Sequence, residues 1–152
     1  MKLNETPVRT ARNFNINNIN LEDFEIQEEQ EKFNGTVITG INPENEILKD
    51  YDLKFGVGER LVNEVKTRAN QSLRLNLSEK TSNIIIENKF DKENSKLIDN
   101  IEIIANEGTS SNIIIKYRSY DQTKNYHNSV IRVRAKMNSK INITIVNLLN
   151  TD

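Results

Sequence analysis

The chain repeats the stretch Glu107-Gly-Thr-Ser-Ser-Asn-Ile-Ile-Ile-Lys116. A close copy is Glu79-Lys-Thr-Ser-Asn-Ile-Ile-Ile-Glu87, and a weaker copy is Lys136-Met-Asn-Ser-Lys-Ile-Asn-Ile-Thr-Ile145. The aligned asparagines are 29 and 30 residues apart, and a fixed period in this range is typical of stacked, repeating architectures. The repeat therefore predicts that three segments occupy comparable strands of successive units: Ile84–Ile86, Ile113–Ile115 and Ile143–Ile145.

Alternating apolar residues extend this pattern over the second half of the chain. Leu73, Leu75 and Leu77 alternate with polar residues, and similar alternation follows in 101–105, 130–136 and 141–149. The isoleucine triplets have no polar alternate, which is typical of strands covered on both faces. A mainly β fold is expected, either a stacked β-solenoid, which the period favours, or a two-layer β-sandwich.

The first seventy residues have a mixed pattern, so we expect an N-terminal region (1–70) followed by β rungs (71–152). Residues 1–20 suit an extended arm, and the acidic segment 22–31 suits a solvated face better than a metal site. A strand, a short helix and a second helix are then expected at Phe33–Ile41, from Asn42-Pro43-Glu44 to about Asp52, and at Glu59–Asn70.

Composition excludes several classes of function. With 21 basic and 22 acidic residues the net charge is −1, so no field is expected that would recruit nucleic acid or a membrane surface. The chain has no cysteine and one histidine, so thiolate-bound clusters and most transition-metal sites are not expected. No run of about 18 apolar residues and no signal peptide is present, and the cytoplasm is the expected compartment.

No combination of residues predicts an active site. His127 lies in a polar segment, 120–128, that we interpret as a loop, where the imidazole would fix a turn through a hydrogen bond. An enzyme that uses His127 remains the minority alternative. Strand alternation places a basic stripe on a solvated face, and no catalytic, cofactor or metal residue is assigned. The stripe consists of Arg132, Arg134, Lys136 and Lys140.

The order and spacing of these segments resemble the SufB/SufD family, the iron–sulfur cluster assembly scaffold proteins of the SUF system. Leu97–Tyr117 is similar to the family's strand that ends in a glutamate-led turn, here at Glu107. Tyr126-His127-Asn128 is similar to its (Phe/Tyr)-His-Asn segment, and Lys136–Asn150 to a further turn-and-strand copy. The resemblance covers roughly residues 53–150.

The resemblance implies a right-handed parallel β-helix after a mostly helical N-terminal region. It also implies a non-catalytic scaffold that assembles with a SufC-like ATPase and a SufB- or SufD-like partner subunit. Family members are longer, and their cluster-assembly residues lie mainly nearer the C-terminus, so none can be placed on this chain. An iron–sulfur cluster would belong only to the full assembly complex.

Because Asp152 directly follows a strand, we expect a fragment, or a short member that needs a partner. Association with like chains through an exposed β edge is also expected. Whether the parent is SufB-like or SufD-like stays open. The alternative function, from another class, is a stand-alone β-sandwich or β-solenoid module that binds a ligand or surface.

Overall fold

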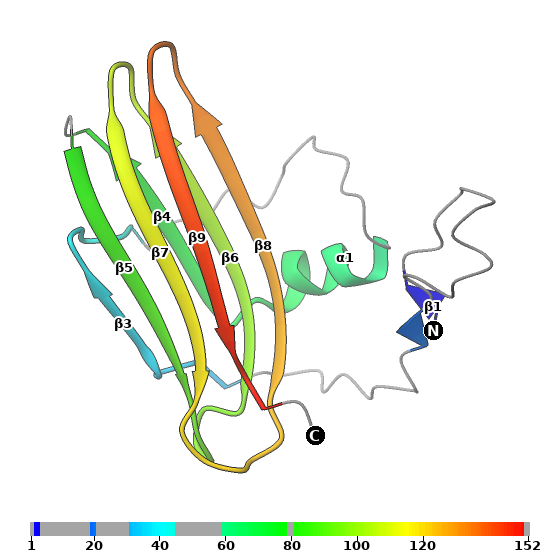
Figure 1. The fold of residues 1–152 in the computed structure, drawn as a ribbon. Coiled ribbons are helices and arrows are strands. Elements are labelled where there is room, and N and C mark those ends of the chain that lie inside the picture. Colours follow the sequence, from blue (N-terminus) through cyan, green and yellow to red (C-terminus); the bar gives the residue numbers. More distant parts are fainter. Residues whose placement is uncertain (1, 4–18, 21–30, 45–58, 79–80, 151–152) are drawn as a thin grey trace, which may run out of the picture.

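The computed structural model describes residues 2–3, 19–20, 31–44, 59–78 and 81–150, and its described part is mainly β (Figure 1). Near the N-terminus, two short strands pair in antiparallel orientation: β1 (Lys2–Leu3) and β2 (Ile19–Asn20). The other elements are β3 (Thr36–Thr39), α1 (Glu59–Arg68), β4 (Gln71–Leu77), β5 (Thr81–Phe90), β6 (Lys96–Ala105), β7 (Ser110–Ser119), β8 (Tyr126–Ala135) and β9 (Lys140–Leu148).

Consecutive long strands alternate between two sheets that face each other (Figure 1). One sheet has the order β4-β6-β8, and all its pairings are parallel. The other has the order β3-β5-β7-β9, in which β5, β7 and β9 are parallel and β3 lies antiparallel on β5. Each turn carries the chain from one sheet to the other, so a strand meets its parallel neighbour one period later.

The turns that connect β6 to β7 and β8 to β9 are built alike. In each, the amide of the fourth residue donates to the carbonyl of the first, from Thr109 to Asn106 and from Ser139 to Lys136, both at 3.1 Å. Gly108 (φ 71°) and Asn138 (φ 59°) adopt left-handed backbone at the third position. Glycine and asparagine are the residue types that tolerate this conformation, so the polar residues in the repeat are turn formers.

The predicted alignment of the three cassettes is confirmed. Asn83 lies opposite Asn112, which lies opposite Asn142, and the three isoleucine-rich segments follow in the same register. The Asn112 amide Nδ2 donates to Asn83 Oδ1 at 3.1 Å, and the Asn142 amide repeats this contact on Asn112 at 2.8 Å. The repeat in the sequence is therefore a spatial repeat of parallel strands.

The main core lies between the two sheets. Every second residue of the strands points inward, and the largest fully buried aliphatic residues include Leu75, Ile86 and Ile101. The expectation that the isoleucine triplets are covered on both faces is wrong in part, because Ile85 and Ile114 lie only half-buried on the outer face. The strand covered on both faces is β6, whose residues 97–103 are all buried.

Helix α1 covers part of the outer face of the β4-β6-β8 sheet (Figure 1). Its apolar residues Val62 and Val65 pack on Ile98 and Val130, which confirms the helix predicted in this region. The strand expected within 33–41 is also present, as the shorter β3. Both elements pack on the strands that follow, so the expected N-terminal region contributes to the same body.

Some sequence predictions lie outside the described residues. These are most of the N-terminal arm, the acidic segment up to residue 30 and the helix expected to run to about Asp52. Of its expected start, Glu44 is described and pairs with Arg74 as an isolated antiparallel bridge. Within the described ranges, no helix has the length and apolar character needed to cross a membrane.

Candidate functional site

His127 lies in a strand, and its interpretation as a loop residue is wrong. Strand β8 begins at Tyr126, because the parallel pairing with β6 continues to Lys96 opposite Tyr126 and Leu97 opposite His127. Strand alternation then points His127 between the sheets, and Tyr126 and Asn128 toward the outer face. The segment 126–128 thus joins two environments rather than forming a turn.

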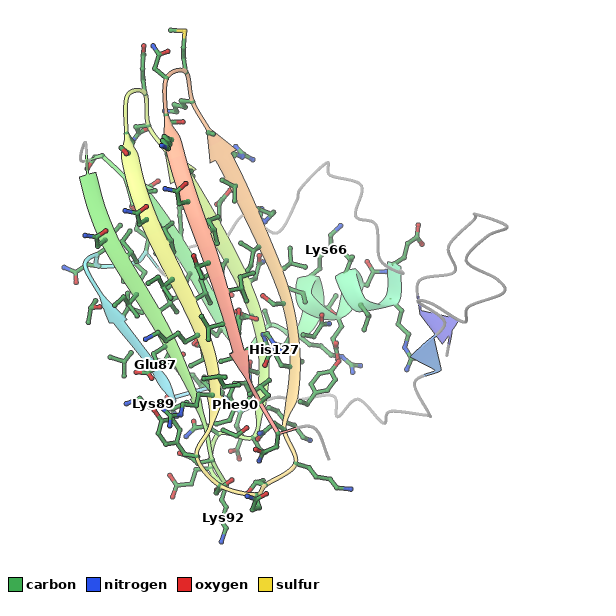
Figure 2. The ribbon with its side chains drawn as sticks, in the orientation of Figure 1. Lys66, Glu87, Lys89, Phe90, Lys92 and His127 are labelled. Atoms are coloured by element: carbon green, nitrogen blue, oxygen red, sulfur yellow. The ribbon has the colours of Figure 1, made fainter. Side chains whose placement is uncertain are left out.

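Inside, His127 belongs to a buried polar cluster. Its Nε2 lies 3.1 Å from Asp99 Oδ1, and the Tyr117 hydroxyl donates to Asp99 Oδ2 at 3.1 Å. The Asp99 side chain is 0% exposed, so both of its oxygens need these partners. The imidazole also stacks on Tyr117 at 3.9 Å between ring centroids, with the edge of Phe90 at 6.2 Å (Figure 2).

Burial and the charge of Asp99 raise the pKa of the Tyr117 hydroxyl well above its usual range, so this group acts as a hydrogen-bond donor. A carboxylate beside an imidazole can act as a general base when a substrate reaches the free ring edge. Here the imidazole is covered by Tyr117 on one side and approached by Phe90 on another. The contacts of this cluster join β6, β7 and β8 across the interior.

On the outer face, the neighbours of His127 anchor α1. The Glu64 carboxylate, itself buried, accepts hydrogen bonds from the Tyr126 hydroxyl and the Asn128 amide. The Asn128 amide also donates to the Leu61 carbonyl at 3.0 Å. Burial, and then Glu64, raise the pKa of Tyr126. The Tyr-His-Asn segment therefore ties the helix to the interior cluster through alternate residues.

A row of alternating charge crosses the outer face of the β4-β6-β8 sheet. In register, Glu44 is followed by Arg74, Glu102 and Arg132. The Arg74 Nε donates to Glu102 Oε2 at 2.8 Å, and Arg132 Nη1 and Arg134 Nε both lie 3.8 Å from Glu102 Oε1. Alternation predicted a solvated basic stripe, but Arg132 is only 3% exposed, so that residue is a structural partner of a buried acid.

Strands β8 and β9 form an open end of the two sheets. Each is hydrogen-bonded to a neighbour on one side, β6 and β7 respectively, and is the last strand of its sheet. Inward positions that are 0% exposed in the preceding strands, Ile103 and Ile115, become 44% exposed at Val133 and 56% at Ile145. The apolar interior is therefore partly uncovered at this end.

A polar hollow of about 550 Å³ lies beside β3 and β4, at the opposite end of the sheets. Thr36 and Gln71 line it, and behind them the Thr36 hydroxyl and the Gln71 amide both donate to Asn88 Oδ1, at 2.8 and 3.2 Å. Among the described residues, no group of three or more His, Asp or Glu side chains is placed to hold a metal ion.

Sequence reasoning missed Asp99, Tyr117 and Glu102, the buried groups that complete these arrangements. The repeat period was the signal that could have found two of them. One period before His127 is Leu97, and Asp99 is the next inward residue along that strand. Glu102 is likewise one period from Arg132. Comparison with protein-family models, curated proteins and solved structures finds no match to this chain.

Proposed function

We propose that the chain is a non-catalytic scaffold segment of the SufB/SufD type, which presents β rungs for assembly with partner subunits in iron–sulfur cluster assembly. In this proposal, β4 to β9 are rungs of a right-handed parallel β-helix. The partners are a SufC-like ATPase and a SufB- or SufD-like subunit, and the compartment is the cytoplasm. The chain has no cysteine, so any cluster would be held by other parts of the complex.

The observation that carries the proposal is the in-register parallel stacking of the three cassettes. A sandwich of antiparallel hairpins would not place Asn83, Asn112 and Asn142 opposite one another. Stacked rungs contact only their neighbours, so the last rung needs a cap or a continuation. The partly uncovered interior at β8 and β9 supports an assembly role for that end. The family assignment itself rests on the resemblance in the sequence.

Co-purification tests the proposal. The full chain is tagged and mixed with a SufC-like ATPase and a SufB- or SufD-like subunit, with an unrelated ATPase of the same class as a negative control. We expect retention of the SufC-like ATPase and of the partner subunit. Ile145→Asp should reduce capture of the partner subunit, whereas Val37→Asp, at an equally accessible aliphatic on β3, should not. A monomer that retains neither protein contradicts the proposal.

The polar hollow favours a second candidate, a stand-alone β module that binds a small ligand. Its floor is a hydrogen-bonded set of side chains, Thr36, Gln71 and Asn88, as is usual for sites that orient a polar molecule. A thermal-shift screen with polar small molecules tests this candidate. A compound that raises the melting temperature of the wild type but not of Gln71→Leu would favour it over the scaffold.

A further inference from the structure

The last rung differs in charge from the rung before it. Residues 126–150 contain four basic side chains and no Asp or Glu, whereas residues 96–125 contain four basic and four acidic side chains. Two of the four, Arg134 and Lys140, are exposed, and Arg134 is 61% exposed. The open end therefore combines uncovered aliphatic residues with unbalanced positive charge.

The register of the charged row indicates what would balance it. From Glu44 to Arg132 the sign of the charge alternates at each successive strand, and the last member lies on β8, the edge strand. A further strand paired with β8 would place its own side chain next to Arg132 and near Arg134. Alternation and the exposed guanidinium of Arg134 both favour a carboxylate at that position.

The other sheet adds a second requirement. The asparagine ladder ends at Asn142, whose amide nitrogen already donates to Asn112, while its own Oδ1 faces the open side of β9. A side-chain amide on an added strand would extend the ladder in the same register. Inward positions beside Val133 and Ile145 call for aliphatic residues, since these cover the exposed core.

We propose that the open end of β8 and β9 binds an acidic strand pair of a partner polypeptide, added parallel to these strands with a carboxylate beside Arg132 and Arg134. This inference rests on the proposed function and names its partner's chemistry. Main-chain pairing supplies affinity in such strand addition, and the side chains supply selectivity. The parallel register is that already used between β6 and β8 and between β7 and β9.

A second copy of the chain is a poorer occupant. Its own open end carries the same cations and no acids, so Arg134 and Lys140 would gain no carboxylate. Its other end is also unsuitable, because β3 lies antiparallel on β5 and covers that edge of the sheet. Charge complementarity thus separates an acidic partner from self-association.

Two matched peptides test the proposal. The basic-rung peptide has the sequence of residues 126–150, and the acidic-rung peptide differs only by Arg132→Glu, Arg134→Glu, Lys136→Glu and Lys140→Glu. Each is labelled and titrated with the full 152-residue chain, with binding measured by fluorescence anisotropy. We expect the acidic-rung peptide to bind about tenfold more tightly at about 0.1 M NaCl, with the preference lost near about 1 M.

A charge swap supplies the control. The double variant Arg134→Glu/Lys140→Glu should reverse the preference, so that the basic-rung peptide binds more tightly. Lys32→Glu/Lys124→Glu, two exposed lysines outside the open end, should keep the wild-type preference. A swap that changes neither affinity shows that charge at the open end does not select the partner.

Three outcomes overturn the inference, and they separate it from the proposed function. Equal binding of both peptides leaves rung addition standing and removes the requirement for acid. Tighter binding of the basic-rung peptide, which matches the last rung of a second copy, assigns the surface to self-association. Failure of both peptides to bind contradicts the inference and the assembly role of this end together.

Discussion

Asp99 is a fully buried carboxyl group, and the side chains around it explain the placement of His127 and Tyr117. A buried carboxyl group is costly unless each oxygen has a hydrogen-bond partner. The imidazole and the phenol provide one partner each, from β8 and β7. The three residues therefore depend on one another and join neighbouring strands through the interior.

This cluster predicts a loss of stability at alkaline pH. The pKa of Tyr117 is raised in the folded state, so the folded protein keeps a proton that the unfolded chain releases above about pH 10. The stabilisation by Tyr117 is complete below that pH and is lost as the pH rises further. The free energy of unfolding of the wild type should fall by up to about 1.4 kcal/mol per pH unit from this group alone.

Urea unfolding between pH 8 and 11.5 measures the effect. Tyr117→Phe should be less stable at pH 8 but should lose less stability as the pH rises. Tyr120→Phe removes a hydroxyl from a half-exposed ring and should keep the pH dependence of the wild type. Parallel curves for the wild type and Tyr117→Phe would contradict the role assigned to the hydroxyl.

Among the elements, β3 is the least like the others, because it is short and antiparallel to the strand that it covers. The backbone leaves β3 at Gly40, where φ is 90°. A Cβ added at this position would lie 2.2 Å from the carbonyl oxygen of Asn83. Close approach to β5 therefore depends on the absence of a side chain.

Two glycine substitutions separate backbone strain from steric overlap. Gly108 also has a left-handed φ, but a Cβ added there meets no atom within 4 Å. Gly108→Ala should cost about 1 kcal/mol, because only the strained conformation opposes the side chain. Gly40→Ala should cost clearly more and should increase amide hydrogen exchange at Ile38. Equal losses in the free energy of unfolding would show that β3 adjusts without strain.

The element scale also separates what the sequence predicts from what it misses. The cassettes, their register and the helix at Glu59–Arg68 follow from local periodicity, and the structure has them. The start of β8 does not, because residues 126–128 are polar and look like a continuation of the preceding loop. They are extended because β6 pairs with them and because Glu64, more than sixty residues earlier, binds two of them.

At the scale of the whole molecule, stability should decline toward the open end. Ile115 and Ile145 are equivalent inward positions of neighbouring strands, but the first is 0% and the second 56% exposed. Ile115→Ala should cost about 2–5 kcal/mol, because it leaves a cavity in a packed core. Ile145→Ala should cost less than about 1 kcal/mol, since water already reaches this side chain.

Chemical denaturation of the two variants checks this gradient. A partner that covers the open end should raise the cost of Ile145→Ala toward that of Ile115→Ala, because the side chain then becomes buried. Equal costs in the isolated chain would contradict it, since the last rung would then be as well packed as the one before.

The sequence by itself determined the strands, their period and their register, because these depend on alternation and on turn residues that recur every 29 or 30 positions. Tertiary structure alone decided the partners of the polar residues. His127 faces Asp99, Arg132 faces Glu102, and Glu64 holds the start of β8. The physical reason is range: alternation assigns a residue to one side of a strand, but only the packed sheets and helix α1 decide what occupies that side.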